Sequence, residues 1–378
     1  GYNRELSPRL NLAVRGYLSR YQFTDRITYA PADPPFRTFG EALWFGGEVR
    51  ARYAVLDDDK LGVTAGVEGT LSQTDSIARV DGQPNLAEVP LDFDLQGVYA
   101  EVDGRPAPWL GFTAGVRGDR NSKLDDRISP RAALFLSKGE RMGVKLLYAE
   151  GFRNPSAFEG FFDDDTNFAG NPDIGAERIR SYELVAWAKP VAGLSVRASG
   201  FRWQAQDLLK QVPIMENGAT VLQFQNVDDL ISTGVELEAS YRSTRGWLAF
   251  VGGVFSKVRT EASDAELVNA PKLTAAGGVS SPRLFDVGNL SVETTYISRR
   301  KTRDPAIDVD PFVGVNLHAS IPDLRGFDLA FGLRNLIGKR ERIPAQEDYD
   351  RTMPTPVLVP VVPGEGRELY VRLGYKFD

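Results

Sequence analysis

The last thirteen residues, Gly366-Arg-Glu-Leu-Tyr-Val-Arg-Leu-Gly-Tyr-Lys-Phe-Asp378, alternate apolar and polar side chains. The apolar positions are Leu369, Val371, Leu373, Tyr375 and Phe377. Residues two apart point to the same side of a β-strand, so these five share one face and the polar residues between them share the other. A terminal strand of this kind can close a barrel whose apolar face meets lipid and whose polar face meets water.

Segments with the same alternation recur along the chain, and short turns and long loops join them in strict alternation. The predicted strands lie near residues 10–21, 41–56, 60–75, 91–104, 107–120, 127–137, 141–152, 180–189, 193–207, 220–241 (with a break near Asp228), 247–258, 271–281, 287–299, 311–321, 326–337 and 366–378. Polar loops are predicted at residues 25–37, 75–90 and 213–219, and the longest loop runs from residue 152 to about residue 179. Alternating short and long connections and an even strand count are typical of outer-membrane barrels.

Strand length separates this fold from its soluble alternatives. A soluble β-sandwich also has many strands, but strands are usually about 5–6 residues long. The segments predicted here run about 10–15 residues, which suffices to cross a bilayer when the strand is tilted. Residues 1–378 are therefore predicted to form an all-β, transmembrane, antiparallel up-and-down β-barrel of about 16 strands. A soluble β fold is the weaker alternative.

Composition excludes several classes of protein. The chain is 42% hydrophobic and 25% charged, and no stretch approaches the ~20 consecutive apolar residues of a membrane helix. The net charge of -6 argues against nucleic acid as a partner. Cysteine is absent, which rules out disulfides and thiolate metal sites.

The sequence contains no catalytic combination of residues. Its single histidine, His318, falls on the polar side of a predicted strand, where a solvated residue is the favoured reading over a base or ligand. No serine has a partner base in a recognisable motif, and no Gly-x-Gly pattern opens a helix after a strand. We therefore expect no enzymatic activity, no cofactor and no metal site.

Several motifs resemble those of TonB-dependent outer-membrane receptors. Tyr148-Ala-Glu-Gly-Phe-Arg-Asn-Pro-Ser156 is similar to a strand-to-loop passage of that family, and Gly170-Asn-Pro-Asp-Ile-Gly-Ala-Glu-Arg178 to its "GNPDLKPE" motif. Asn226 with Thr233-Gly-Val-Glu-Leu-Glu238 resembles "N…GVELE", and Leu333-Arg-Asn-Leu336 resembles "NLFD". Gly366-Arg367 resembles the "GR" that opens the last strand. These matches are collinear and cover about residues 95–378.

The chain departs from the family pattern at three places. Gly175-Ala176 stands where Lys-Pro is usual, and Ile337-Gly338 stands where Phe-Asp is usual. Asp378 follows the aromatic residue that is normally the last one. Members of the family also have an N-terminal plug domain, a TonB-contacting box and a barrel of 22 strands. The strands predicted here number about 16, and no segment resembles the plug domain. The expectation is therefore the C-terminal portion of such a barrel without a plug domain, and a barrel complete at about 16 strands is the alternative.

The resemblance implies a receptor and transporter of the Gram-negative outer membrane. Its ligand would be a scarce iron–siderophore, haem, cobalamin or oligosaccharide, and its partners would be outer-membrane lipid, lipopolysaccharide and the TonB complex, reached through a plug and Ton box. Two alternatives remain: a passive porin-like channel, and a structural or secretion-associated barrel completed or filled by another protein chain.

The residues expected to contact ligand lie in the longest outer loop. They are Arg153, Asn154, Phe161, Phe162 and Asn171. Exposed phenylalanines on a loop either pack within it or contact a ligand or partner, and both readings are open. Asp163-Asp164-Asp165 can be read as a Ca²⁺ site or, preferably, as a solvated acidic tip. The basic run at residues 299–303 can be read as an anion site or, preferably, as a solvated loop.

Overall fold

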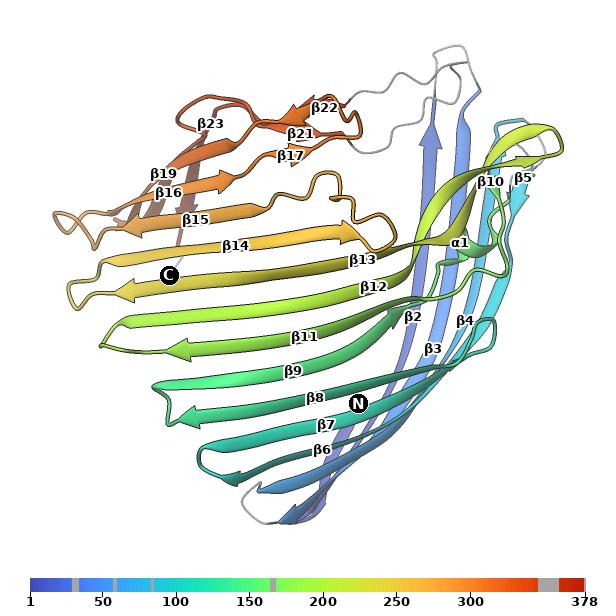
Figure 1. Ribbon diagram of the computed structural model, residues 1–378, viewed down its shortest axis with the longest axis horizontal. Helices are drawn as coiled ribbons and strands as arrows, with labels where there is room; N and C mark the ends of the chain where they lie inside the picture. The colour runs from blue at the N-terminus through green and yellow to red at the C-terminus, as the bar shows by residue number, and fades with distance from the viewer. Residues whose placement is uncertain (29–33, 57–59, 83–84, 164–167, 346–359, 377–378) are drawn as a thin grey trace. The chain divides into compact units, whose positions relative to one another are not determined.

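The computed structural model describes residues 1–28, 34–56, 60–82, 85–163, 168–345 and 360–376 (Figure 1). These residues divide into two compact units. Unit 1 comprises Gly1–Leu136, Leu146–Tyr182 and Gln204–Asp229, and unit 2 comprises Ser137–Lys145, Glu183–Trp203 and Leu230–Asp378. No helix in the described ranges is long and apolar enough to cross a membrane.

Sixteen of the described strands are eight residues long or longer, which confirms the predicted number. They are β2 (Leu10–Ile27), β3 (Phe36–Leu56), β4 (Leu61–Val80), β6 (Leu91–Ala107), β7 (Leu110–Asn121), β8 (Arg127–Lys138), β9 (Met142–Arg153), β11 (Glu177–Ala188), β12 (Leu194–Glu216), β13 (Ala219–Arg242), β14 (Leu248–Thr260), β15 (Leu273–Ser280), β16 (Asn289–Ile297), β19 (Phe312–Leu324), β20 (Phe327–Arg334) and β23 (Glu368–Tyr375).

The remaining elements are short. They are β1 (Tyr2–Ser7), β5 (Asn85–Glu88), β10 (Phe168–Ala169), β17 (Arg300–Lys301), β18 (Asp308–Val309), β21 (Arg342–Pro344), β22 (Val361–Pro363) and the helix α1 (Ala157–Phe161). Nineteen strands belong to one sheet, while β17–β18 and β21–β22 form two small sheets. The described pairings are antiparallel except that between β10 and β13. The all-β antiparallel prediction is thus confirmed.

Several strands are longer than predicted. β2 continues to Ile27, β4 to Val80 and β12 to Glu216, where polar loops were expected. β13 runs unbroken through Asp228 to Arg242, so the expected break there is wrong. The polar residues in these segments belong to strands that continue past the apolar stretch, so polarity alone did not mark the strand ends.

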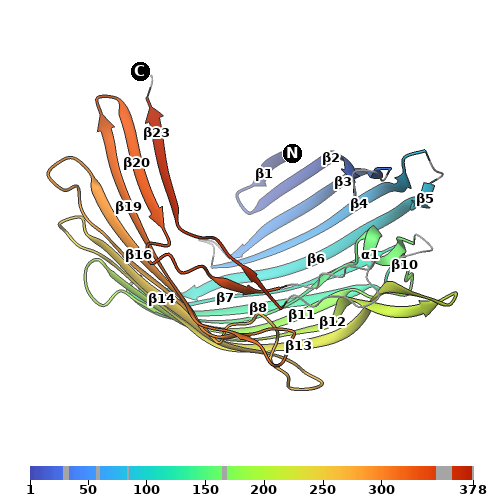
Figure 2. The same cartoon turned by 90° about the horizontal axis from the view of Figure 1, so that it is seen from above.

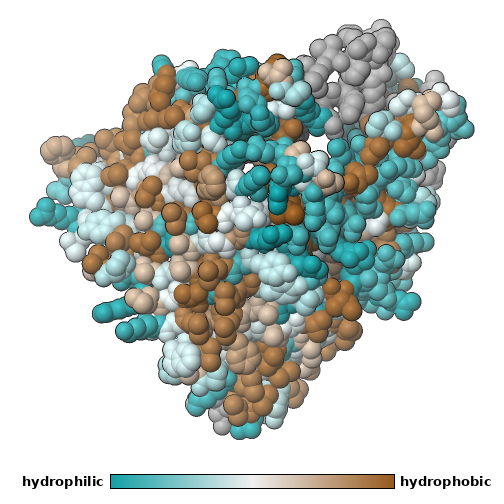
Figure 3. Space-filling model, in the orientation of Figure 1, coloured by the Kyte–Doolittle hydropathy of each residue, from teal (hydrophilic) through white to brown (hydrophobic). Residues whose placement is uncertain are grey.

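In unit 1, two faces of the sheet can be followed through β2, β3, β4, β6 and β7, which lie side by side in Figures 1 and 2. The register places Tyr17 beside Gly46 and Thr70, and we call this side the Tyr17 face. The opposite side, where Leu18 lies beside Phe45 and Leu71, is the Leu18 face. In Figure 3, apolar side chains gather over β6, β7 and β8.

Polar contacts hold the Tyr17 face together. Tyr99 Oη donates to Glu48 Oε1 at 2.5 Å. Its ring lies over Gly66, where an added Cβ would come within 2.4 Å of the ring. Arg117 Nη2 lies 2.6 Å from Glu68 Oε1, and Arg52 pairs with Asp103. A glycine opposite an aromatic ring thus lets the ring lie flat along the sheet and reach a carboxylate two strands away.

In unit 2, the same separation of faces is present. β13 pairs with β14 so that Glu236 lies opposite Val254, and β16 pairs with β19 so that Glu293 lies opposite Asn316. His318 lies opposite Ser291 and Gly332, on this polar side, as predicted.

The terminal strand β23 pairs antiparallel with β20 along its whole length. Its apolar residues Leu369, Val371, Leu373 and Tyr375 are 74, 62, 64 and 52% exposed. Phe377 lies outside the described residues. A continuous row of exposed apolar side chains on a strand is unfavourable in water and favourable in lipid.

Few apolar side chains are fully buried, because a single sheet has no second layer to cover it. Those of unit 1 lie mainly at the loop end: Ala169, Ile174, Ala176, Val221 and Leu222. The tertiary core of this unit is therefore in the loop that was predicted to bind ligand.

Candidate functional site

The loop between β9 and β11 folds back onto the β12–β13 hairpin within unit 1. α1 forms at its start because Ser156 and Glu159 make a reciprocal capping box. Ser156 N donates to Glu159 Oε2 at 2.7 Å, and Glu159 N donates to Ser156 Oγ at 3.3 Å. This Ser-x-x-Glu spacing is readable in the sequence, although α1 was not predicted.

Arg153 links three segments of this loop. Its Nη1 and Nη2 donate to the two oxygens of Glu159 at 2.8 and 2.9 Å, and its Nε donates to Glu177 Oε2 at 2.6 Å. The other oxygen of Glu177 accepts from the Leu209 backbone N at 2.8 Å. The guanidinium therefore ties the end of β9 to α1 and, through Glu177, to β12.

Both carboxylates are held in the charged form. Burial by itself raises the pKa of Glu159, but hydrogen bonds from Arg153 and Ser156 outweigh it and leave that pKa below its usual value. Burial likewise raises the pKa of Glu177. The hydrogen bonds from Arg153 and from the Leu209 backbone outweigh burial, so the pKa of Glu177 is also below its usual value. The hydrogen bonds from Glu159 and Glu177 raise the pKa of Arg153.

Asn226 and Asn171 make the second connection. Asn226 Oδ1 accepts from Gly175 N at 2.7 Å, and Asn226 Nδ2 donates to Gly175 O at 3.1 Å and to Asp207 O at 2.6 Å. Asn171 Nδ2 donates to Phe224 O at 2.7 Å. Beneath them Ile174 is 2% exposed. The motif Gly170–Arg178 is thus a segment clamped onto the hairpin by side-chain amides.

Four phenylalanines pack together beside this clamp. The ring centroid of Phe158 lies 4.9 Å from that of Phe162, 5.4 Å from that of Phe168 and 5.9 Å from that of Phe224. Phe158 nevertheless remains 45% exposed. Phe162 therefore packs within the loop, while one side of the cluster faces solvent.

The five predicted residues fall into two groups. Arg153, Phe162 and Asn171 each make the internal contacts just described. Phe161 lies at the end of α1 and is half-buried, and the buried Oδ1 of Asn154 has no hydrogen-bond partner in the described part of the chain. The residues that sequence reasoning missed are Glu159 and Glu177.

Two further loop sites were considered in the sequence, the acidic run at residues 163–165 and the basic run at residues 299–303. Asp164 and Asp165 lie outside the described residues, and those that are described contain no acidic or histidine group able to hold a metal ion. The basic run is paired internally: Arg300 Nη2 lies 2.8 Å from Glu341 Oε1, and Lys301 Nζ lies 3.2 Å from Asp308 Oδ1. These contacts weigh against an anion site. The preferred reading, a solvated loop, is wrong for Arg300, which is 6% exposed and pairs with Glu341.

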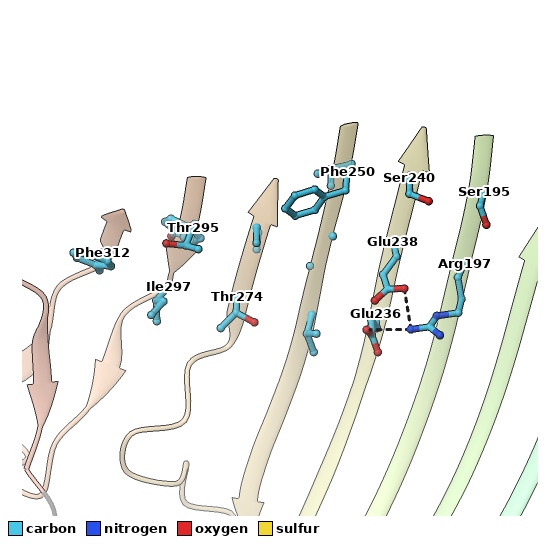
Figure 4. Close-up of a pocket in the computed structure, with 18 of the residues that line it drawn as sticks. Ser195, Arg197, Glu236, Glu238, Ser240, Phe250, Thr274, Thr295, Ile297 and Phe312 are labelled. Atoms are coloured by element: carbon cyan, nitrogen blue, oxygen red, sulfur yellow. Dashed lines mark ion pairs between the residues drawn. The ribbon is translucent and has the colours of Figure 1, made fainter. Parts of the chain in front are cut away.

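Unit 2 carries a hollow of about 690 Å³ on its polar side (Figure 4). Gly252 and Ala276 are among the small residues that line it, and Phe250 and Phe312 contribute aromatic rings. Arg197 Nη2 lies 2.8 Å from Glu238 Oε2 and 3.9 Å from Glu236 Oε1. Two carboxylates thus share one guanidinium, and this hollow carries an excess of negative charge.

Comparison with known proteins gives one family and a consistent set of relatives. The family described as "TonB dependent receptor-like, beta-barrel" matches residues 1–336. Heme/hemopexin utilization protein C of Haemophilus influenzae (strain 86-028NP) is 24% identical over an alignment of 246 residues, and the match covers 57% of this chain and 35% of that protein. The chain therefore spans about a third of the length of this curated relative.

Solved structures agree in fold. The copper transporter OprC aligns with a TM-score of 0.78 at 16% identity, over 98% of this chain and 64% of that one. The siderophore receptor PirA from Acinetobacter baumannii aligns with a TM-score of 0.73 at 13% identity, over 99% of this chain and 61% of that one.

Proposed function

Because the chain belongs to the TonB-dependent receptor β-barrel family, we propose that it takes up an iron chelate, either a ferric siderophore or haem, across the outer membrane. Members of this family are receptors rather than enzymes, and the chain is an integral protein of the Gram-negative outer membrane. The share of each relative that it spans supports the further proposal that residues 1–378 are the C-terminal barrel portion of such a receptor.

The observation that carries the proposal is the loop clamped by Arg153 and Asn226. A receptor loop must present side chains to ligand at fixed positions, and a clamp of charged and amide hydrogen bonds provides that rigidity. Within this proposal Asn154 and Phe161 contact ligand, while Arg153, Phe162 and Asn171 hold the loop in position.

The ligand is proposed to be a chelate rather than a bare soft metal ion. Copper(I) prefers thiolate, thioether and imidazole ligands. The chain contains no cysteine, one histidine and three methionines. Met142 starts β9 and Met215 lies near the end of β12. The names of the haem and siderophore relatives support the iron chelate.

Growth under iron limitation tests the proposal. The gene that encodes the chain is expressed in a strain without its own siderophore and haem receptors, and growth is measured on haem, ferric enterobactin and ferric desferrioxamine. We expect growth on at least one chelate that is lost when tonB is deleted. TonB-independent growth, together with stable conductance in a planar bilayer, would instead establish a passive channel.

A further inference from the structure

Unit 2 carries the same two kinds of residue on four successive short turns. In each turn a basic residue is followed two positions later by an exposed apolar one. The turns join β11 to β12, β13 to β14, β15 to β16 and β19 to β20, and the first three lie along the left-hand side of Figure 1. The eight residues, which we call the short-turn rim, are Lys189 and Val191, Arg245 and Trp247, Arg283 and Phe285, and Arg325 and Phe327.

Contacts between neighbouring turns hold the rim together. The first turn accepts a backbone hydrogen bond from the end of β13, where the second turn starts. Gly246 of the second turn lies against Pro282 of the third, and a Cβ added to Gly246 would come within 3.2 Å of the Pro282 side chain. Arg283 Nη2 donates to Pro322 O at 3.1 Å, which connects the third turn to the end of β19. The rim is therefore a continuous surface.

Phe285 has a backbone conformation that phenylalanine rarely adopts. Phe285 and Asp286 are the two central residues of their turn, with φ of 52° and 55°. Asn-Gly is the preferred pair for such a turn, and a bulky residue is unfavourable at positive φ. Phe285 is also 95% exposed. The chain thus keeps an aromatic ring where both backbone conformation and hydration oppose it, which indicates a contact outside the chain.

Polar groups fix the base of this turn. Ser281 is 6% exposed, and its Oγ accepts from Leu290 N at 2.9 Å. The carbonyl of Ser281 accepts from Asn289 Nδ2 at 3.1 Å. The ring of Phe285 is therefore presented from a rigid support, which reduces the entropy lost on binding.

The short-turn rim is positively charged although the whole chain is acidic. The chain has a net charge of -6, whereas the four basic residues of the rim have only two carboxylates beside them in sequence, Asp286 and Asp323. The four basic side chains are exposed, and none has an ion-pair partner among the described residues. A surface of unpaired cations attracts anions, phosphate groups among them.

The rim is continuous with the lipid-facing surface of unit 2. Phe327 pairs with Tyr375, their ring centroids lie 4.8 Å apart, and Tyr375 belongs to the row of exposed apolar residues in β23. Aromatic residues at the end of an apolar band are typical of the level of the lipid headgroups, and short turns of outer-membrane barrels face the periplasm. The rim therefore lies at the inner leaflet of the outer membrane, which consists of phospholipids.

We propose that the short-turn rim binds anionic phospholipids of the inner leaflet. The basic side chains of the rim pair with the phosphate groups, and its aromatic rings occupy the boundary between headgroups and acyl chains. A cation and an apolar side chain two residues apart can contact these two parts of one lipid. This inference goes beyond the uptake of a chelate, because it depends only on the place of the chain in the outer membrane.

Native mass spectrometry tests the role of the charges by counting bound lipids. The product of the complete gene is purified in detergent and titrated with phosphatidylglycerol or with zwitterionic phosphatidylcholine of the same acyl chains. We expect Kd to be about fivefold lower for phosphatidylglycerol. The triple variant Arg245→Gln/Arg283→Gln/Arg325→Gln should lose this preference. Arg299→Gln, the matched control, should retain it, because the Arg299 side chain is 63% exposed but follows β16 at the end away from the rim.

Phe285→Asn separates lipid binding from folding. Asparagine tolerates positive φ, so the variant should melt at the temperature of the parent or above it. We expect the variant to bind both lipids about three- to tenfold more weakly, because it lacks the ring that enters the lipid. Phe285→Trp keeps an aromatic ring and should keep the affinity of the parent.

Several outcomes would overturn the inference. The parent could bind the two lipids equally, or Phe285→Asn could bind them as tightly as the parent. Inorganic phosphate at constant ionic strength could displace phosphatidylglycerol, which would show that the rim takes a soluble anion. Phe285→Asn could lose a co-purifying periplasmic protein while its lipid binding is unchanged, which would assign the rim to a protein partner. Failure of chelate uptake, in contrast, would leave this inference standing.

Discussion

At the scale of single residues, the chain's candidate site is determined by how a few polar side chains are shared. Arg153 was predicted to contact ligand, yet its guanidinium is divided between Glu159 and Glu177. Asn171, from the same set, donates a hydrogen bond from its side-chain amide to the backbone carbonyl of Phe224. Charged and amide groups in this loop therefore act first on the loop itself, and ligand contact is left to the side chains that they position.

Removing one carboxylate from Arg153 tests this positioning role. In Glu159→Gln the two-point contact and the capping box weaken, and we expect the local unfolding free energy of α1 to fall by about 0.5–1.5 kcal/mol, because the guanidinium is half exposed. Amide hydrogen exchange of residues 156–161 measures the effect. Glu216→Gln, which removes a carboxylate at the exposed tip of the β12–β13 hairpin, is the control. Equal exchange in both variants would contradict the assignment.

The same carboxylates predict how the loop responds to acid. The pKa values of Glu159 and Glu177 lie below the usual 4.5 in the folded loop and return to it on unfolding. Their contribution to stability is therefore complete above the unfolded-state pKa and is lost as the pH falls through the folded-state values. Pepsin cleavage within residues 154–177 should rise between about pH 5 and about pH 3. The double variant Glu159→Gln/Glu177→Gln should be cleaved across this range with a flatter pH profile; an unchanged profile would refute the explanation.

At the scale of elements, neighbouring strands are fixed to one another by rings that lie over glycines. Tyr99 in β6 crosses Gly66 in β4 to reach Glu48 in β3. One side chain thereby links three strands. Any side chain at residue 66 has to displace the ring and so break this link.

Gly66→Ala is expected to destabilise the sheet by about 1–3 kcal/mol, because the added methyl group occupies the position of the Tyr99 ring. Thermal unfolding, followed by the shift in gel mobility between folded and heated protein, measures the change. The matched control is Gly69→Ala in the same strand, since its added Cβ would meet its nearest neighbour, Leu95 O, at 3.8 Å. Equal melting temperatures for the two variants would show that the ring moves aside without loss.

At the scale of the whole molecule, we infer the membrane boundary from a change in one face of β2, β3, β4 and β6. This face carries Val14, Val49, Val67 and Val98 and, further along the strands, Arg20, Glu41, Gln73 and Asp94. The change is not visible in any one strand as a break, because alternation continues through it. It becomes visible only when the strands are aligned by their hydrogen-bond register. Val67 and Gln73 lie on the same face of β4, on opposite sides of this change.

Single cysteines test this boundary without interference, because the chain has no native cysteine. In intact cells, Gln73→Cys should react with a membrane-impermeant maleimide, whereas Val67→Cys should stay unreacted because lipid covers it. Lysine substitutions at the same two positions should differ in their effect on stability. Val67→Lys should lower the free energy of unfolding by about 2–4 kcal/mol, the cost of a lysine near the membrane midplane, and Gln73→Lys should be tolerated. Labelling of both cysteines would place the boundary elsewhere.

The sequence by itself determined the fold class and the number of long strands. Period-two alternation, as in Leu369 to Tyr375, is a local property that each strand carries independently of its neighbours. The family motifs were also local, and they placed the clamped segment Gly170–Arg178 in a loop that does form the tertiary core of unit 1. The capping box at Ser156 is equally local, because it needs only a serine followed by a glutamate three residues later.

Only the tertiary structure decided which residues of the loop face one another. Glu177 reaches Leu209 and Asn226 reaches Gly175 across separations of 32 and 51 residues, which no local pattern encodes. Which aromatic side chains share a face likewise depends on register, since Tyr21, Trp44 and Phe93 lie on one face but come from three strands. Alternation of side chains along a strand only assigns each residue to one of the two faces of the sheet. The hydrogen-bond pairing between strands decides which residues of different strands lie side by side on that face.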